Sequence, residues 1–369
     1  MQKKPLTIGF VRRGYSSSGG AESYLKRLAG GVVAAGHSAW LITDGEWPAK
    51  EWTFGGITRI REESPRAFAD EVAKLDGRSS CDVIMSLERL WGCDVYRAGD
   101  GVHAAWLERR ARFCHPVRNF LRRLRSKHDD IVALEHSLFA QRRARHVIVN
   151  SEMVKAEIVR LYGYPSQNIA LVRNGVPTAD FAKAREARAI TRLTLGLEPD
   201  VFTVLFVGSG WERKGLRFAV EAVEKFGGNT RLVVVGRGSQ AKYRSARTQF
   251  IGVRDPTALY GAADVFLLPT LYDPFSNACL EALAAGLPVI TTSANGFAEI
   301  IESRIHGSVM NDPPDISSIA DELRYWSDAR RREAAFAANI QLASAYDISV
   351  NVRQTLQVLL QIADSAAST

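Results

Sequence analysis

Short apolar runs alternate with longer amphipathic segments along almost the whole chain. The apolar runs are rich in valine, isoleucine, leucine and phenylalanine, which is typical of strands buried on both faces of a parallel sheet. The segments between them have the length and apolar periodicity of crossover helices. The alternation therefore predicts an α/β protein built from parallel sheets.

The expected strands form two series. Those of the first half lie at residues 6–11, 40–43, 81–86, 95–98 and 146–150, with a helix expected over 21–36. Those of the second half lie at residues 202–207, 232–235, 265–268 and 289–291. Two series predict two domains, because 369 residues are enough for two hydrophobic cores.

A break between the series is expected over residues 169–177, where the sequence Asn-Gly-Val-Pro disfavours regular structure. We therefore expect an N-terminal domain at residues 1–170 and a C-terminal domain at residues 171–345. A last helix within residues 346–369 is expected to pack back on the first domain.

Residues 272–292, YDPFSNACLEALAAGLPVITT, carry the most specific pattern in the chain. A helix is expected over 278–285, because Pro274 disfavours helical backbone before it and Gly286 ends it. Asn277 is expected to cap this helix. The apolar residues after Gly286 are expected to form a buried strand.

Two acids, Asp273 and Glu281, bracket the start of this helix. Free backbone N–H groups at a helix start can bind phosphate, and carboxylates can accept hydrogen bonds from sugar and ribose hydroxyl groups. The N–H groups concerned are those of Phe275, Ser276, Asn277, Ala278, Cys279 and Leu280. The segment favours a ligand with phosphate and hydroxyl groups over simple capping by an acid.

Two further loops suit a phosphorylated ligand. Arg213 and Lys214 follow the first strand of the second series, where two cations can stabilise a leaving diphosphate. A pair of surface cations is the alternative. The loop from Gly14 to Gly20 lies between a strand and a helix, so its backbone can approach an anion. The GxGxxA pattern from Gly236 is a weak signal for a dinucleotide, because it follows the second strand of its series and no acid follows at the distance of a ribose partner.

The net charge is +8, and residues 109–127 contain many basic residues and no acid. Interleaved apolar residues there could form one face of a helix, which suits an anionic membrane surface or a phosphorylated acceptor. A solvated helix packed on its own domain suits the pattern equally well. Nucleic acid ranks well below both, because no nucleic-acid-binding module is recognised.

No apolar run reaches the roughly 18–20 residues that span a bilayer, and the N-terminus lacks a signal-peptide pattern. A cytoplasmic location is expected, with association at the inner membrane face as one option. Cysteines 81, 93, 114 and 279 show neither disulfide nor zinc spacing. Without a DxD motif or a histidine cluster, no metal and no cofactor are expected.

The segment from Asp273 resembles the nucleotide-sugar-dependent glycosyltransferases of family 4, whose pattern is E-x7-E with an EALAxGxPVI stretch. Here seven residues separate Asp273 from Glu281, and EALAAGLPVI begins at Glu281. The Arg-Lys-Gly run at Arg213 matches as well. Within the family, the chain is most similar to the lipopolysaccharide core glucosyltransferase I group. One departure is that Asp273 replaces Glu and is one methylene shorter, which changes its reach toward the donor sugar.

The resemblance implies a GT-B fold, with two Rossmann-like parallel-sheet domains facing a cleft, and retaining transfer without a metal. The donor-binding residues that it implies, besides the helix start, are Gly19, Gly20, Arg213, Lys214 and Glu281. Glu281 would hold the ribose and Asp273 the sugar hydroxyl groups. Arg254 follows an expected strand and either lines the base pocket or forms a surface turn.

The N-terminal half is expected to bind the acceptor. Asp100 and His103 lie close together in a glycine turn after an expected strand, where a carboxylate and an imidazole can orient or deprotonate a hydroxyl group. Such a turn is also common without any function. We take both as candidate catalytic residues, together with Asp273.

The implied function is transfer of a hexose, with UDP-glucose as the expected donor, to a lipopolysaccharide-core or related envelope glycan. A front-face mechanism is expected, because both acids approach the donor from one side and leave no nucleophile opposite. A nucleotide-sugar epimerase of the same fold is one alternative. A non-enzymatic basic protein that binds membranes or polyanions is the other.

Overall fold

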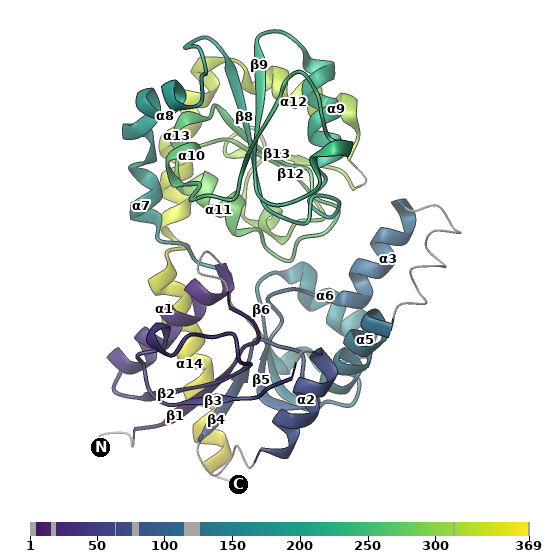
Figure 1. Cartoon of the computed structure of the whole chain (residues 1–369), viewed down its shortest axis with the longest axis vertical. Helices are drawn as coiled ribbons and strands as arrows, with labels where there is room; N and C mark the ends of the chain where they lie inside the picture. Colours follow the sequence, from purple (N-terminus) through teal and green to yellow (C-terminus); the bar gives the residue numbers. More distant parts are fainter. Residues whose placement is uncertain are drawn as a thin grey trace. The chain divides into compact units, whose positions relative to one another are not determined.

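The computed structural model describes residues 5–15, 20–62, 64–75, 81–113, 126–312 and 314–367. The chain forms two compact units (Figure 1). The N-terminal unit contains residues 1–173 and 349–369, and the C-terminal unit contains residues 174–348. The boundaries expected from the sequence, after residues 170 and 345, lie within a few residues of these.

In the described part of the chain, the N-terminal unit has a seven-stranded parallel sheet in the order β3-β2-β1-β4-β5-β6-β7. Its strands are β1 (Thr7–Val11), β2 (Ser38–Thr43), β3 (Ile57–Arg59), β4 (Val83–Ser86), β5 (Cys93–Arg97), β6 (Ala144–Val149) and β7 (Ile169–Leu171). The strand order reverses between β1 and β4. In open α/β sheets, ligands bind at the carboxyl ends of the strands beside such a reversal.

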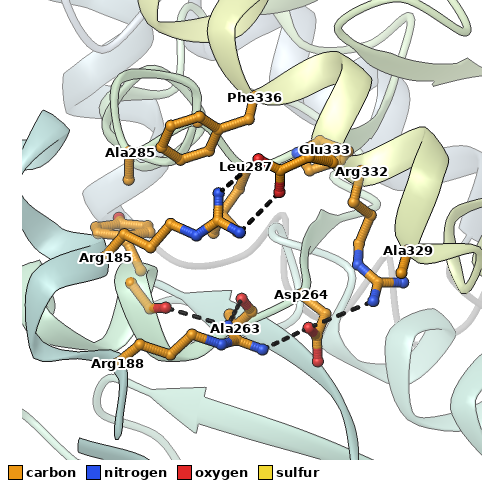
Figure 2. A pocket seen from close by; sticks show the side chains of 14 residues that line it. Arg185, Arg188, Ala263, Asp264, Ala285, Leu287, Ala329, Arg332, Glu333 and Phe336 are labelled. Carbon is orange, nitrogen blue, oxygen red and sulfur yellow. Dashed lines mark hydrogen bonds and ion pairs between the residues drawn. The ribbon is translucent and has the colours of Figure 1, made fainter.

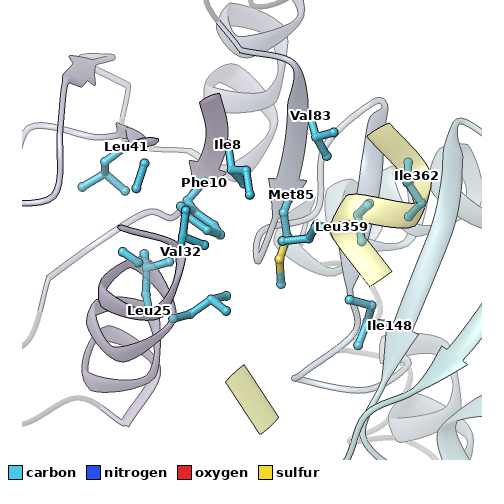
Figure 3. Close-up of a cluster of buried hydrophobic side chains, with 14 of the residues drawn as sticks. Ile8, Phe10, Leu25, Val32, Leu41, Val83, Met85, Ile148, Leu359 and Ile362 are labelled. Atoms are coloured by element: carbon cyan, nitrogen blue, oxygen red, sulfur yellow. The ribbon is translucent and has the colours of Figure 1, made fainter. Parts of the chain in front are cut away.

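The helices of this unit are α1 (Gly20–Ala34), α2 (Pro65–Lys74), α3 (His103–Phe113), α5 (Ser126–Phe139), α6 (Glu152–Tyr162) and α14 (Ile348–Ala367). Side chains of α14 enter the same buried cluster as β1 and α1 (Figure 3). Phe10 and Leu25 meet Leu359 and Ile362 in this cluster. A Cβ at Gly31 of α1 would lie 2.2 Å from Val352 of α14, so glycine permits the close approach of the two helices.

β3 and β7 were not expected from the sequence. Both are three-residue strands at the edges of the sheet, where pairing with one neighbour is enough and no long apolar run is needed. β7 occupies the start of the 169–177 region that was predicted as a break. That prediction is wrong for these residues, because β7 pairs with β6 before the chain leaves the unit.

The C-terminal unit has, among its described residues, a six-stranded parallel sheet in the order β10-β9-β8-β11-β12-β13. Its strands are β8 (Phe202–Val207), β9 (Thr230–Val235), β10 (Thr248–Gly252), β11 (Val265–Leu268), β12 (Val289–Thr292) and β13 (Gly307–Met310). Its helices are α7 (Thr178–Ala182), α8 (Arg188–Thr194), α9 (Leu216–Phe226), α10 (Thr257–Ala262), α11 (Asn277–Ala284), α12 (Ile316–Trp326) and α13 (Ala329–Ser344). Here the order reverses between β8 and β11, so the chain after these two strands meets at one edge.

Candidate functional site

Lys214 and Asp273 form an ion pair at the carboxyl edge of the C-terminal sheet. Lys214 follows β8 and Asp273 follows β11, and Lys214 Nζ donates to Asp273 Oδ2 at 2.5 Å. The Asp273 side chain is 6% exposed and that of Lys214 15% exposed. The pair therefore joins the two loops that the strand reversal brings together, and it holds a carboxylate and a cation where a ligand of this sheet is expected.

The glycine of the Arg-Lys-Gly run makes this approach possible. Gly215 has a φ of +75°, and a Cβ there would lie 1.9 Å from the carbonyl oxygen of Pro269. The carbonyl oxygen of Arg213 accepts hydrogen bonds from Leu271 N at 2.8 Å and from Thr270 Oγ1 at 2.9 Å. The main chain of Arg213 is thus fixed against the loop after β11, and the residue as a whole is half-buried.

Asn295, which sequence analysis missed, holds the Asp273 loop from the other side. Its Oδ1 accepts from Ser276 N at 3.2 Å and from Phe297 N at 3.1 Å, and its Nδ2 donates to Thr291 Oγ1 at 2.9 Å. Asp273 N also donates to the carbonyl oxygen of Ala294 at 2.9 Å. The sequence carries only a weak signal for Asn295, namely that a polar residue comes shortly after the buried strand β12.

The start of α11 differs from the expectation in its cap. Ser276, not Asn277, is the N-cap, and its side chain accepts a hydrogen bond from Cys279 N. Asn277 is the first helical residue, and its Oδ1 accepts from Asn174 Nδ2 at 2.8 Å. The prediction was wrong because the extended backbone of Ser276 places the cap one residue earlier.

The cap also narrows the set of N–H groups that a ligand can use. Ser276 N donates to Asn295, Cys279 N to the Ser276 side chain, and Leu280 N to the Ser276 carbonyl. Asn277 and Ala278 start the helix, so their N–H groups have no acceptor within it. The side chains of Phe275, Cys279 and Leu280 are buried, so none of the three offers its side chain to a ligand.

Glu281 lies on α11 and accepts a hydrogen bond from the hydroxyl group of Tyr260, at 2.7 Å. Tyr260 belongs to α10 and is fully buried. Burial, together with the charge of Glu281, raises the pKa of Tyr260 well above its usual value, so the hydroxyl group stays protonated and donates. Tyr260 had no sequence signal, because a tyrosine in an apolar helix resembles any core aromatic residue.

Arg254 does not join this group of residues. It is exposed after β10, and its Nε donates to the carbonyl oxygen of Ile251, near the end of that strand, at 3.1 Å. The neighbouring Asp255 bonds to Thr257 at the start of α10. Arg254 therefore lies in a surface turn in this structure.

In the N-terminal unit, Asp100 and His103 lie at the carboxyl edge after β5. Asp100 is exposed, whereas His103 starts α3 and its Nε2 is 3.0 Å from His128 Nδ1. The buried Glu135 of α5 accepts from His103 N at 2.6 Å and from Arg89 Nε at 2.9 Å. Glu135 thus caps α3 and fixes His103. The sequence did not indicate it, although an acid within the apolar run IVALEHSLF was a signal.

A pocket of about 810 Å³ lies beside the reversal point between β1 and β4. Its lining includes Arg12, Asp44, Arg61 and Glu88, which follow β1, β2, β3 and β4. Arg12 donates to Glu88 at 2.7 Å, and burial raises the pKa of Glu88. Gly20 is the first residue of α1, beyond this edge, and Gly19 lies outside the described residues.

The basic segment expected over residues 109–127 is described in part. Residues 114–125, which carry most of the expected amphipathic face, lie outside the described residues. Arg109 pairs with Glu157 at 3.5 Å, which is a contact within its own unit. Among the described residues, no helix is long and apolar enough to cross a membrane, and no group of three or more histidine, cysteine or acidic residues is arranged to hold a metal ion.

Two Rossmann-like units of parallel sheet define the GT-B class of fold, which the crystal structure of WaaG, a glycosyltransferase involved in lipopolysaccharide biosynthesis, also has. The two chains align with a TM-score of 0.82 at 24% identity, over 95% of this chain and 99% of that one. HepE from Anabaena, in a complex with UDP and glucose, aligns with a TM-score of 0.74 at 18% identity, over 96% and 99% of the chains.

Sequence comparison identifies the family. Residues 18–180 match the model described as Glycosyltransferase Family 4, and residues 201–328 match Glycosyl transferases group 1. A probable transglycosylase of Burkholderia thailandensis is 30% identical over 98% of both chains. The lipopolysaccharide glucosyltransferase WaaG of Escherichia coli is 25% identical over 86% of this chain and 89% of its own. Two other relatives match only in part: the alignment with this chain covers 45% of the length of one and 55% of the length of the other. The chain belongs to the glycosyltransferases of family 4.

Proposed function

We propose that the protein is a retaining, metal-independent hexosyltransferase that uses a UDP-sugar donor and a glycan acceptor of the lipopolysaccharide core or a related envelope polymer. The observation that carries the proposal is the cluster at the carboxyl edge of the C-terminal sheet. There the Lys214–Asp273 pair, Arg213 and the open N–H groups of α11 lie on loops that meet at one edge. The UDP and glucose bound in the HepE complex support the choice of donor, and similarity to the lipopolysaccharide glucosyltransferase WaaG supports the acceptor class.

In this proposal the helix start and Arg213 bind the diphosphate, Glu281 the ribose and Asp273 a sugar hydroxyl group. The Lys214 charge is already opposed by Asp273. A bound donor therefore has to share this pair, with Lys214 contacting a phosphate oxygen while Asp273 accepts from the sugar. Arg213 supplies the net positive charge that the leaving diphosphate requires.

The transfer step is a front-face substitution. The bond between the sugar C1 and the phosphate oxygen breaks, and a bond from C1 to the acceptor oxygen forms on the same face. The acceptor proton passes to the leaving phosphate oxygen, so no protein nucleophile is needed. The cations lower the energy of this step because they stabilise charge that grows on the diphosphate.

The acceptor is assigned to the pocket of the N-terminal unit, with Asp100 and His103 at the same edge of that sheet. The guanidinium groups of Arg12 and Arg61 and the carboxylates of Asp44 and Glu88 suit an acceptor with an anionic group and several hydroxyl groups. A cytoplasmic location and contact of residues 109–127 with an anionic membrane complete the proposal.

The first experiment is calorimetry with UDP, ADP, GDP and their glucose conjugates, in buffer with EDTA. Selective binding of UDP-glucose, lost in Glu281→Gln and retained in Glu221→Gln on the exposed side of α9, supports the donor site. Binding of none of these nucleotides contradicts the proposal. The product anomer, read by NMR after transfer, tests retention.

The relative from Burkholderia thailandensis supports one competing reaction, in which the donor is a glycan and no nucleotide takes part. Transfer assays with glycan donors alone separate the two. Turnover without any nucleotide sugar would favour a transglycosylase, and strict dependence on the nucleotide sugar would exclude it.

A further inference from the structure

A second pocket lies at the amino edge of the C-terminal sheet (Figure 2). Its wall includes Asp264 before β11, Pro288 before β12, Tyr260 of α10 and the start of α13 at Ala329. The proposed donor site lies after the carboxyl ends of β8 and β11, so the two sites lie at opposite edges of one sheet. The pocket has a volume of about 140 Å³, which admits a phosphate-sized group.

One buried carboxylate in this wall faces three guanidinium groups. Asp264, whose side chain is 8% exposed, lies 2.7 Å from Arg188, 3.6 Å from Arg192 and 3.7 Å from Arg332. Its Oδ2 also accepts from Thr203 N at 2.8 Å. A single carboxylate cannot neutralise three arginines, so positive charge remains at the pocket.

A fourth arginine lies at the rim of the pocket, and its charge is balanced by Glu333. Arg185 donates to Glu333 at 2.8 and 3.4 Å, and its guanidinium group lies over the Phe336 ring at 4.5 Å. Four arginines and two carboxylates leave a net charge of +2 in this cluster. Burial, with repulsion from neighbouring arginines, lowers the pKa of Arg332, as expected where cations are incompletely compensated.

We propose that this pocket is a binding site for the phosphate group of a small phosphorylated metabolite. A phosphate dianion neutralises the excess charge, and guanidinium groups are well suited to bind its oxygens in pairs. Arg185, Arg188 and Arg332 line the pocket; Arg185 belongs to a short 3-10 helix, η4 (Ala184–Ala187), and the other two belong to α8 and α13. Figure 2 shows Arg185 turned toward Glu333, and Arg188 and Arg332 turned toward Asp264. The 16-residue helix α13 begins at Ala329 in the same wall, and the carboxylate of Asp328 caps it by accepting from Arg330 N.

Residues of the pocket wall also contact or adjoin the proposed donor site. Tyr260 forms part of its wall and also donates its hydroxyl hydrogen to Glu281. Ala285, just after the end of α11, lines it as well, and the start of that helix is the proposed diphosphate site. Phosphate at the pocket therefore alters donor affinity, and by linkage the donor alters phosphate affinity by the same factor. This coupling rests on the proposed function, whereas the phosphate site itself does not.

Calorimetric titration of the full chain with inorganic phosphate, at constant ionic strength, tests the site. The expected result is one phosphate site whose Kd rises about tenfold in Arg185→Gln, since one charge-assisted contact is lost. Glu333→Gln removes the carboxylate that competes for Arg185, so phosphate is expected to bind more tightly to this variant. Arg217→Gln, an exposed arginine paired with Glu221 on α9, is the matched control.

Arg213→Gln separates this pocket from the proposed donor site. Phosphate binding that persists in Arg213→Gln and weakens in Arg185→Gln supports the proposal. Binding that is lost in Arg213→Gln and unchanged in Arg185→Gln overturns it, and so does the absence of phosphate binding to the wild-type chain. UDP-glucose titrations with and without phosphate then measure the coupling. Identical donor affinities under the two conditions would contradict the proposed coupling.

Discussion

Tyr260 donates the hydrogen of its hydroxyl group to Glu281 across 2.7 Å, and the tyrosine side chain is fully buried. The bond joins α10 to α11 and sets the orientation of the acid that is proposed to hold the ribose of the donor. The orientation of Glu281 therefore depends on Tyr260, which no sequence pattern near Glu281 specifies.

Replacing Tyr260 by phenylalanine is expected to weaken donor binding about tenfold, because a hydrogen bond to a charged group contributes about 1.5–3 kcal/mol. The loss should appear as a higher KM for the nucleotide sugar with a smaller change in kcat. Steady-state kinetics measure both. Tyr325→Phe, at a ring that contacts Arg304 and Arg331, should leave KM unchanged, and an equal loss in that variant would argue against a specific role for Tyr260.

Lys214→Met is expected to abolish transfer and also to lower the free energy of unfolding by about 3 kcal/mol, since it leaves the Asp273 carboxylate buried without its cation. Adding Asp273→Leu should restore most of that stability, because no unpaired charge is left. Denaturant unfolding and transfer assays on the wild-type chain and these two variants check this. A double variant as unstable as Lys214→Met would show that the pair is not the source of the effect.

Gly215→Ala should prevent folding of the C-terminal unit or cost more than about 4 kcal/mol. Its Cβ would overlap the carbonyl oxygen of Pro269 at 1.9 Å, on a backbone with φ of +75°. Gly196→Ala is the control, because its φ is +66° but nothing lies within 4 Å of the added atom. That variant should lose only about 1–2 kcal/mol from the backbone conformation. Circular dichroism melting compares the two, and equal losses would contradict the packing argument.

His146 on β6 is expected to make stability depend on pH. Burial, with the nearby charge of Arg145, lowers the pKa of His146 below 6.5 in the folded state. The unfolded chain then binds more protons as the pH falls through 6.5, so stability is present above that value and is lost on acidification. His146→Gln should flatten the unfolding free energy between about pH 7 and pH 5. An unchanged slope in this variant would assign the pH dependence to other groups.

The sequence predicted the central strands because each is a buried apolar run, such as residues 202–207 and 265–268, which match β8 and β11 to the residue. It gave no bounds for β3, β7, β10 or β13, which are the edge strands of the two sheets, because edge strands need few apolar residues. Similarly, the helix expected over residues 278–285 differs by one residue at each end from α11 (Asn277–Ala284), yet its cap was predicted at Asn277 instead of Ser276.

The sequence by itself determined the family, the alternation of strand and helix, and the acids and cations of the proposed donor site. These depend on local patterns, which contiguous residues carry. Only the tertiary structure decided which partners those residues have, namely Asn295 for the Asp273 loop, Tyr260 for Glu281 and Glu135 for the start of α3. It also gathered Arg188, Arg192 and Arg332 around Asp264. Such contacts join residues far apart in the chain, and the order of strands in a sheet, rather than any local pattern, determines which loops meet.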